Sequence, residues 1–374
     1  MNRSVLGTLT PAQFLRRHWQ KKPLLVKAAL PDVRDRFSAA ELRALACRDE
    51  VESRLVTCTH GHWDVMHGPF KPHSLRQPPA TRWALLVQGV DLHVAKAREL
   101  LERFNFVPYA RLDDVMLSLA APGGGVGPHF DSYDVFLLQA QGRRRWRISS
   151  QRDLRLVDGA PLRILRDFRP QQEFEVDPGD LLYLPPHYAH DGIALTDCIT
   201  CSIGFRAPAQ QELAAAFLQW LPDTLHLEGR YRDPGLAPQA NPAEIGTAMV
   251  EQIDRMLASI RWRREEVETF LGEYLTEPKP QVWFNAPQDP LGYGAFVKQA
   301  RVQGIRLSLK TRMLYRGTRV FINGDSRVIP VQARATIKAL ANEREIACWR
   351  SPCTWATRAV YEWYRSGYVD LRSR

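Results

Sequence analysis

The chain has 374 residues, of which 51 are Lys or Arg and 41 are Asp or Glu, so its formal net charge is +10. Six cysteines scattered along a chain long enough for two or three domains argue against a disulfide-bonded secreted scaffold and favour a reduced, cytoplasmic setting. With no signal-peptide pattern and no apolar run near the roughly 18 residues that span a bilayer, we expect a soluble protein with no membrane contact, whose positive charge favours acidic partners such as nucleic acid without requiring them.

Short strands dominate the first two hundred residues. Thr10 is the expected N-cap of a first helix that ends before Pro23, and a second helical stretch covers Lys96–Arg103. The runs with strand character are Trp83–Gln88, Val115–Leu119, Val135–Gln139, Trp146–Ile148, Leu181–Leu184 and Ile199–Phe205. Because Gly and Pro turns separate them, we expect an antiparallel barrel or a double-sheet jelly roll over residues 1–208.

The pattern changes after Pro208. Residues 209–277 have apolar side chains at helical spacing, in Gln210–Leu221 and Ala243–Leu275. Residues 278–374 have a hairpin signal at Asn323-Gly324, followed by helical patterns over Val331–Asn342 and Thr357–Arg365. A small hairpin with helices resembles a winged-helix module. Its last helix is aromatic rather than strongly basic, which favours core packing or protein contact over nucleic-acid binding.

The most informative segment is the glycine-rich stretch 123–131, which ends in His129-Phe130-Asp131. In an extended strand, residues two apart point to the same face, so His129 and Asp131 can bind one metal ion. With a second histidine they would form the two-His, one-carboxylate set that suits non-haem Fe(II) and leaves positions open for co-substrate and oxygen. The alternative is an ordinary strand edge with no metal.

Two histidines compete for the third ligand position. His190 opens a strand that continues through Ile193, whereas His187 directly follows two prolines and is expected in an exposed loop. We therefore select His190. The alternative for His190 is a histidine that is hydrogen-bonded beside the carboxylate of Asp191.

A buried arginine is expected on the strand after Gly142. Alternation places Arg144 on the inward face with Trp146 and Ile148, and the other three arginines on the outward face. A buried guanidinium needs a carboxylate, which is either an internal Asp or Glu or, beside a metal, a ligand. A 2-oxo acid would chelate iron and reach Arg144, with Ser118 as a further donor. The outward arginines form a solvated face or a basic patch for an RNA-associated substrate.

Three other features are candidate functional sites, and their patterns favour structural roles or leave the role open. The residues Cys58, His60, His62, His67 and His73 have the composition of a zinc site, but their spacing favours surface and loop positions. Cys198 and Cys201 are three apart, so in a strand they face opposite ways and are expected to be packing residues. Tyr133 either lines the mouth of the metal pocket or lies in the core.

The sequence resembles the bacterial JmjC-type ribosomal oxygenases in four segments, namely 111–114, 122–136, 142–147 and 204–208. The resemblance implies an α+β chain with a double-stranded β-helix (a cupin-like JmjC domain), a helical region that forms a homodimer, and a winged helix. It implies Fe(II) at His129, Asp131 and His190, and 2-oxoglutarate at Arg144 and Ser118, with O₂ as oxidant. The expected reaction is hydroxylation at C3 of an arginine in a large-subunit ribosomal protein, number sixteen of its series.

Two rival functions remain open at this point. A lysine demethylase could use the same scaffold and oxidant, because hydroxylation of an N-methyl group releases formaldehyde. A non-catalytic cupin-like module could instead bind ribosomes or nucleic acid and hold its metal for structure alone. Consumption of 2-oxoglutarate separates this last function from both enzymes.

Overall fold

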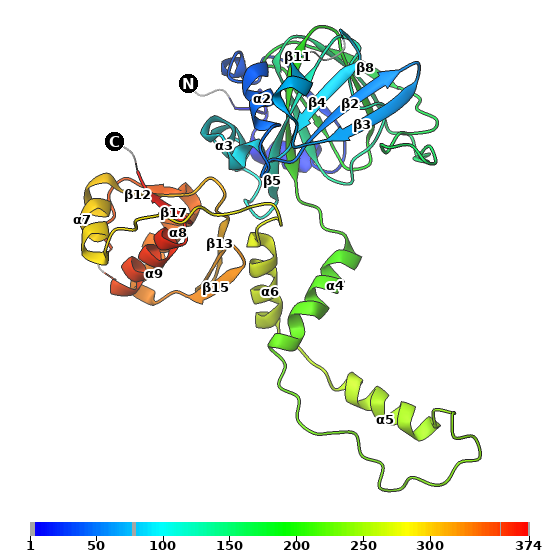
Figure 1. Cartoon of the computed structure of the whole chain (residues 1–374), viewed down its shortest axis with the longest axis vertical. Helices are drawn as coiled ribbons and strands as arrows, with labels where there is room; N and C mark the ends of the chain where they lie inside the picture. Colours follow the sequence, from blue (N-terminus) through cyan, green and yellow to red (C-terminus); the bar gives the residue numbers. More distant parts are fainter. Residues whose placement is uncertain (1–3, 77–79, 352, 373–374) are drawn as a thin grey trace. The chain divides into compact units, whose positions relative to one another are not determined.

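The computed structural model describes residues 4–76, 80–351 and 353–372. Figure 1 shows the helices and strands in chain order. Contacts divide the chain into two compact units. The first unit consists of residues 1–207, 278–312 and 330–374, and the second unit of residues 208–277 and 313–329. The α+β class is confirmed, while the division into 1–208, 209–277 and 278–374 stays a prediction.

Most of the elements belong to the first unit. In chain order they are α1 (Pro11–Arg17), β1 (Leu24–Val26), α2 (Ala39–Leu45), β2 (Ser53–Thr59), β3 (His62–His67), β4 (Trp83–Val87), α3 (Ala95–Glu102), β5 (Leu112–Ala120), β6 (Val135–Gln141), β7 (Arg144–Ser149), β8 (Gln172–Val176), β9 (Leu181–Leu184), β10 (Ala189–Ala194), β11 (Cys198–Phe205), α7 (Tyr293–Gln303), β12 (Ile305–Leu307), α8 (Arg334–Glu343), β16 (Glu345–Ile346), α9 (Thr354–Arg365) and β17 (Val369–Leu371). Those of the second unit are α4 (Gln210–Trp220), α5 (Thr247–Ala258), α6 (Arg264–Thr276), β13 (Met313–Arg316), β14 (Arg319–Ile322) and β15 (Asp325–Val328). None of the described helices has the length and apolar character needed to cross a membrane.

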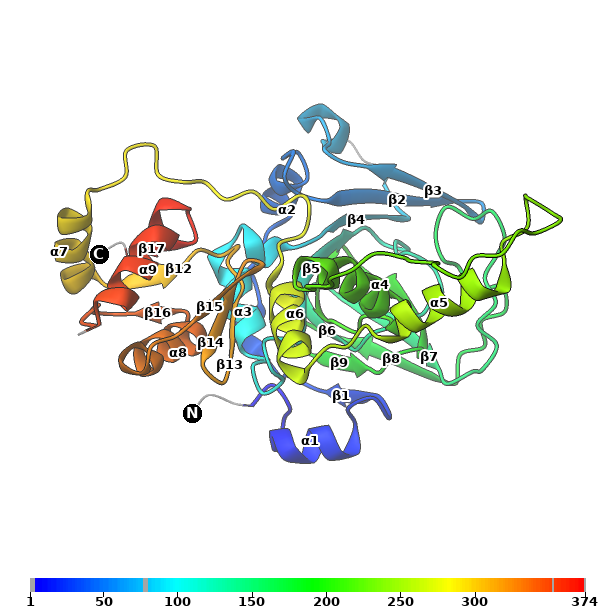
Figure 2. The same cartoon turned by 90° about the horizontal axis from the view of Figure 1, so that it is seen from below.

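Two antiparallel sheets face each other in the first unit. The larger has the order β1-β9-β6-β11-β5-β4-β2-β3 and the smaller β10-β7-β8 (Figure 2). Val135 and Leu137 of β6 pack between the sheets against Trp146 and Ile148 of β7. From β6 to β11 the chain passes repeatedly between the two sheets, with β6, β9 and β11 in the larger and β7, β8 and β10 in the smaller. This is a double-stranded β-helix, as the strand pattern and the resemblance predict.

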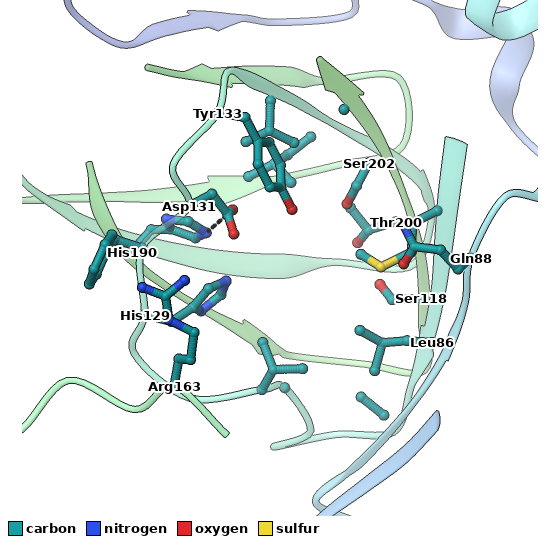
Figure 3. Close-up of a pocket in the computed structure, with 18 of the residues that line it drawn as sticks. Leu86, Gln88, Ser118, His129, Asp131, Tyr133, Arg163, His190, Thr200 and Ser202 are labelled. Carbon is teal, nitrogen blue, oxygen red and sulfur yellow. Dashed lines mark ion pairs between the residues drawn. The ribbon is translucent and has the colours of Figure 1, made fainter. Parts of the chain in front are cut away.

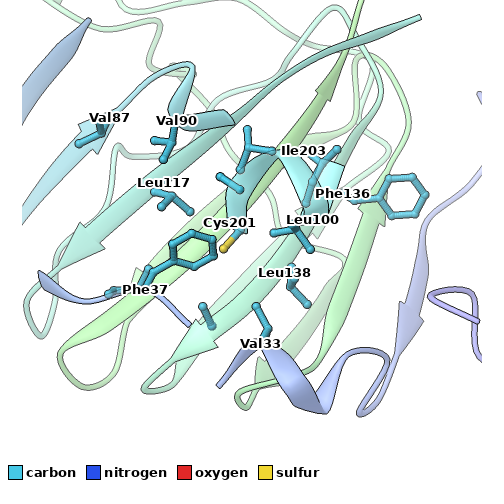
Figure 4. Packing of buried hydrophobic residues seen from close by; sticks show 14 of the residues in the cluster. Val33, Phe37, Val87, Val90, Leu100, Leu117, Phe136, Leu138, Cys201 and Ile203 are labelled. Atoms are coloured by element: carbon cyan, nitrogen blue, oxygen red, sulfur yellow. The ribbon is translucent and has the colours of Figure 1, made fainter. Parts of the chain in front are cut away.

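The opposite face of the large sheet carries the main hydrophobic core (Figure 4). Alternation along β6 turns Phe136 and Leu138 to this side, where Leu100 of α3 packs on them. Phe14 of α1 joins the same core. As predicted, Thr10 caps α1: its hydroxyl accepts a hydrogen bond from the backbone N–H of Gln13 (3.2 Å). This core packs on the face of the large sheet that points away from the small sheet.

The C-terminal part of the first unit is a small antiparallel sheet, β16-β12-β17, with helices α7 to α9. The aromatic side chains of α9 are packed inside it, because Trp363 is 2% exposed and Tyr364 8%. Tyr364 stacks on Phe296 of α7, with ring centroids 4.8 Å apart. The prediction that these aromatics serve core packing or protein contact rather than nucleic-acid binding agrees with this burial.

The second unit packs α6 on the hairpin strands β13 to β15. A side chain at Gly272 of α6 would lie 2.4 Å from the ring of Phe321, so only glycine admits this close approach. The predicted Asn323-Gly324 turn joins β14 and β15, and both residues have positive φ, as a tight hairpin turn requires.

The helical pattern over Ala243–Leu275 is interrupted in the structure. Two helices, α5 and α6, replace the continuous run, and residues 259–263 between them are not helical. The side chain of Glu266 accepts a hydrogen bond from the backbone N–H of Arg263, which caps a new helix. The apolar periodicity continues through the break and therefore conceals it.

Candidate active site

A glycine-rich turn places the first two candidate ligands beside β10. The backbone N–H of Gly123 donates to the carbonyl of Ala194 (2.8 Å), and that of Ala194 donates to the carbonyl of Gly124 (2.9 Å). A Cβ atom at Gly125 would lie 2.4 Å from the carbonyl oxygen of Gly192. The turn therefore needs glycine at 125, since the atom it would meet belongs to the backbone and cannot rotate away.

His129 and His190 form an isolated antiparallel β-bridge. Each backbone N–H donates to the other residue's carbonyl, at 2.9 and 2.8 Å, so the two side chains lie on the same side. Their rings are 4.2 Å apart between centroids. Asp131, two residues along, brings its Oδ2 to 3.6 Å from Nε2 of His190 (Figure 3). One ligand atom from each of the three residues lies within 4.8 Å of the others.

Hydrogen bonds set the tautomers of both histidines. Nδ1 of His129 lies 2.9 Å from the carbonyl oxygen of Gly127, and Nδ1 of His190 lies 2.9 Å from that of Tyr188. A carbonyl only accepts, so each Nδ1 donates, and each Nε2 keeps a lone pair for a metal. Burial, with the neighbouring His129, lowers the pKa of His190 to about 4, which keeps its ring neutral near pH 7. Two imidazole nitrogens and a carboxylate oxygen suit Fe(II).

The structure separates the two competing histidines. The side chain of His187 is exposed, and this residue contributes its backbone N–H, which donates to the carbonyl of Asp131 (2.7 Å). His190 is 2% exposed and lies with the other two candidate ligands. Asp191 forms an ion pair with Arg147 instead. The alternative that His190 is hydrogen-bonded beside Asp191 is therefore wrong.

Arg144 and the candidate ligands lie on the same inner wall. In the β7–β10 register, Ile148 pairs with His190, while Arg144 pairs with Ala194, four residues further along. Trp146 lies between these two levels, with its ring 5.9 Å from that of His190. His190, Trp146 and Arg144 all line one cavity of about 260 Å³. A co-substrate that reached from the candidate metal ligands to Arg144 would pass over the indole of Trp146.

No carboxylate within the described part of the chain pairs with Arg144, although the residue is only 4% exposed. The alternative of an internal Asp or Glu partner is therefore not supported. Its Nε is buried without a hydrogen-bond partner among these residues. Such a guanidinium is costly to bury alone, so the arrangement favours an anionic ligand.

Ser118 is the hydroxyl that can complete this end of the cavity. The amide of Gln139 is oriented by two carbonyls, because its Nε2 donates to Gln141 (2.7 Å) and Gly142 (3.2 Å). Its Oε1 therefore accepts the hydroxyl hydrogen of Thr200 (2.9 Å). Ser118 lies opposite Thr200 in the β5–β11 register and lines the cavity. Thr200 donates its hydroxyl hydrogen to Gln139, whereas the hydroxyl hydrogen of Ser118 has no acceptor among the described residues and can go to a ligand.

The outward arginines of β7 do not form a free basic patch. Arg145 pairs with Glu173 (3.3 Å) and Glu175 (2.9 Å), Arg143 lies 3.7 Å from Glu175, and Arg147 pairs with Asp191. The idea that these arginines dock an RNA-associated substrate is corrected, because both neighbouring strands neutralise them: β8 supplies Glu173 and Glu175, and β10 supplies Asp191.

The structure also places the other residues that the sequence singled out: the Cys and His cluster at 58–73, Tyr133, and the cysteines at 198 and 201. His62 and His67 lie on edge strand β3, and among the described residues the group at 129, 131 and 190 is the one set of three His, Cys, Asp or Glu side chains close enough to share a metal. Tyr133 lines the cavity and is 41% exposed, which agrees with the mouth position rather than the core. Cys198 and Cys201 face opposite ways, as predicted, but Cys198 contacts Arg144, which the spacing did not indicate.

Replacing Gly125 by valine should disrupt the arrangement of His129, Asp131 and His190. The added atoms would push β10 away at Gly192, and we expect a loss of about 1–3 kcal/mol in the free energy of unfolding with weaker metal binding. Chemical denaturation and metal titration measure both. Gly294→Ala is the matched control, because nothing lies within 4 Å of the added carbon. Unchanged metal affinity in Gly125→Val would contradict the close approach of the turn to β10.

The structure combines facing antiparallel sheets, a His-x-Asp pair bridged to a distant histidine, and an inward arginine that pairs with no carboxylate among the described residues. These features match the centre expected of a JmjC-type oxygenase. The family model described as "JmjC domain" matches residues 99–213, and the one described as "ROXA-like winged helix" matches residues 259–370. The chain belongs to the JmjC-domain ribosomal oxygenases, as the relatives below establish.

Among these relatives is the ribosomal protein uL16 3-hydroxylase of Escherichia coli, which is 35% identical over 90% of this chain and 89% of its own length. A probable ribosomal oxygenase of Haemophilus influenzae is 38% identical over 54% of this chain and 50% of its own length. The solved structure of the E. coli ribosomal oxygenase YcfD with cobalt and 2-oxoglutarate is 32% identical, has a TM-score of 0.84, and covers 98% of this chain and 99% of that one.

Proposed function

We propose that this protein is an Fe(II)- and 2-oxoglutarate-dependent oxygenase that hydroxylates C3 of an arginine side chain in ribosomal protein uL16. The observation that carries the proposal is one cavity that joins the group His129, Asp131 and His190 to the inward Arg144, which has no carboxylate partner among the described residues. The similarity to a uL16 3-hydroxylase along nearly the whole chain supports the substrate.

Each residue has a defined task in this proposal. His129, Asp131 and His190 hold Fe(II), which, when bound, supplies the activation of O₂. Arg144 and Ser118 hold the distal carboxylate of 2-oxoglutarate by charge-assisted hydrogen bonds. One oxygen atom of O₂ enters the C–H bond of the substrate and the other ends in succinate, with release of CO₂, so the reaction balances.

The mouth of the cavity suits a cationic side chain. Asp113 lies there but is already paired with Lys279 and Arg312, each at 3.3 Å. Asp114 is buried, and burial next to Asp113 raises its pKa to about 6. Its Oδ2 accepts from Nε2 of Gln88 (2.7 Å) and from the backbone N–H of Gly89 (3.1 Å), and lies 3.9 Å from Nζ of Lys279. The acceptor capacity that remains is therefore at Oδ1. A guanidinium entering beside it would stabilise the charged form of Asp114.

The direct test uses purified protein with Fe(II), 2-oxoglutarate and uL16. We expect succinate to form in step with a gain of one oxygen atom on an intact arginine, located by mass spectrometry. Loss of a methyl group would indicate the demethylase. Binding to ribosomes without any succinate would indicate the non-catalytic module, and either result would overturn the proposal.

We also propose that two copies form a homodimer through the second unit. Helix α5 buries none of its residues within the chain, and its apolar side chains follow helical spacing on one face: Met249, Val250, Ile253, Met256 and Leu257. Each is 37% exposed or more. A second copy that covers this face would remove apolar surface of the kind that stabilises obligate interfaces.

Introducing a charge on this face should dissociate the dimer. We expect Ile253→Glu to shift the mass measured by light scattering from two chains to one. Glu251→Gln lies on the opposite face of α5 and should leave the mass unchanged. A wild-type protein that runs as a single chain at micromolar concentration would refute the homodimer.

Because the proposed substrate is a ribosomal protein, we place the enzyme in the cytoplasm with the ribosome. Contact with nucleic acid is compatible with this function but is not required by it. The net charge of +10 favours such contact. The ion-paired arginines of β7 do not contribute a free patch to it.

A further inference from the structure

The guanidinium of Arg144 is held by two uncharged groups. Its Nη2 lies 3.5 Å from Sγ of Cys198 on β11, and its Cζ lies 5.6 Å from the ring centroid of Trp146 on β7. Cys198 is 1% exposed and Arg144 is 4% exposed, so the contact is inside the protein. A guanidinium has only donors, so the sulfur is the acceptor.

The neutrality of these contacts matters for ligand binding. An internal carboxylate would compete with an anionic ligand for the same donors, and would cancel the charge that attracts the ligand. A thiol and a ring face orient the guanidinium without cancelling its charge. Cys198 occupies one of five N–H donors and leaves the others for a carboxylate in the cavity.

The position of the indole is also fixed. Trp146 pairs with Gly192 across the β7–β10 register, and a Cβ atom at Gly192 would lie 2.4 Å from the indole ring. The ring therefore rests directly on the backbone of β10. Arg144 lies over this ring and also contacts the sulfur of Cys198, and these two contacts limit the rotamers of a side chain that is otherwise long and flexible.

We propose that Cys198 is a positioning residue for the co-substrate: its sulfur accepts a hydrogen bond from Arg144 and fixes the guanidinium where it meets the distal carboxylate of the keto-diacid. The inference rests on the proposed function, in which Arg144 binds 2-oxoglutarate. Cys198 acts through Arg144 and touches neither the candidate metal ligands nor, in this account, the substrate.

The chain offers a matched control on the same strand. Cys201 lies three residues further along β11 and faces the other way, into the hydrophobic core with Leu117 and Leu138 (Figure 4). Burial raises the pKa of the Cys201 thiol, so Cys201 is a protonated, packed cysteine. Substituting Cys201 removes the same atoms from the same sheet without changing the surroundings of Arg144.

The experiment measures the affinity of the Co(II)-loaded protein for 2-oxoglutarate by calorimetry, without turnover. We expect Cys198→Ala to weaken binding about 3- to 10-fold, the size of a typical single hydrogen bond, because a thiol sulfur is a weak acceptor. Cys198→Ser restores an acceptor and should recover most of this loss. Cys201→Ala should lower the melting temperature and leave the affinity for 2-oxoglutarate unchanged. Cobalt affinity should stay the same in all three.

Two outcomes separate this inference from the proposed function. If Cys198→Ala binds 2-oxoglutarate like the wild type while Arg144→Met does not, the positioning role is overturned and the co-substrate site stands. If Arg144→Met itself binds normally, the co-substrate role of Arg144 fails, and the positioning role fails with it. Should the alanine variant not fold, Cys198→Val fills the space of the thiol without an acceptor and gives the same test.

Discussion

Replacing His190 by alanine is expected to abolish hydroxylation and to weaken metal binding more than about 100-fold. Outer partners of a metal ligand are typically worth about 10- to 100-fold in affinity, and a ligand itself should be worth more. His190 is the residue that joins the far strand β10 to the His129 and Asp131 pair, through the backbone bridge and its Nε2. Equilibrium dialysis against Co(II), with an activity assay on uL16, measures both effects.

The matched control for this variant is His187→Asn. His187 is exposed and has φ of +61°, a conformation that asparagine tolerates well. This control should retain metal affinity and activity. A His190→Ala protein that folds and still binds Co(II) like the wild type would show that His190 is not a ligand, and loss of metal in His187→Asn would point to the other histidine.

Replacing Arg144 by methionine is expected to raise the KM for 2-oxoglutarate about 100-fold while iron content stays near normal. Methionine keeps much of the volume of the side chain, but it removes the charge that the distal carboxylate meets. Truncating one partner of a buried, hydrogen-bonded charge pair typically costs about 2–5 kcal/mol, which corresponds to roughly 30-fold or more in affinity. Steady-state assays over a range of 2-oxoglutarate concentrations give this value.

Arg145→Met is the matched control for Arg144→Met. Arg145 lies on the same strand but faces outward, paired with Glu173 and Glu175, and exposed ion pairs contribute little. We expect its KM for 2-oxoglutarate to equal that of the wild type. A loss of iron in Arg144→Met would contradict the account, because the residue would then support the metal rather than the co-substrate.

The metal group and the inward arginine could be predicted because each depends on strand alternation. His129 and Asp131 are two apart in extended chain, and Arg144 shares a face with Trp146, so local spacing was enough to orient them. The choice of His190 over His187 followed from the same argument, since one opens a strand and the other follows two prolines. The structure brings the predicted group together at one cavity.

The features that were missed depend on partners distant in sequence. His62 and His67 are exposed, as the prediction of surface positions implies, but they lie on the edge strand β3, which depends on pairing with β2 rather than on a loop. Strand β8 supplies Glu173 and Glu175 to the arginines of β7, which the arginine run alone could not reveal. The contact between Arg144 and Cys198 crosses 54 positions of the chain and arises where β7 and β11 approach the same cavity.

The most direct test of the account is a crystal structure of the protein with Mn(II) and 2-oxoglutarate. We predict an anomalous peak within bonding distance of Nε2 of His129, Nε2 of His190 and a carboxylate oxygen of Asp131, with the far carboxylate of the keto-diacid on Arg144. A peak elsewhere, or an imidazole of His190 turned away from the other two side chains with no space for the keto-diacid beside them, would contradict it.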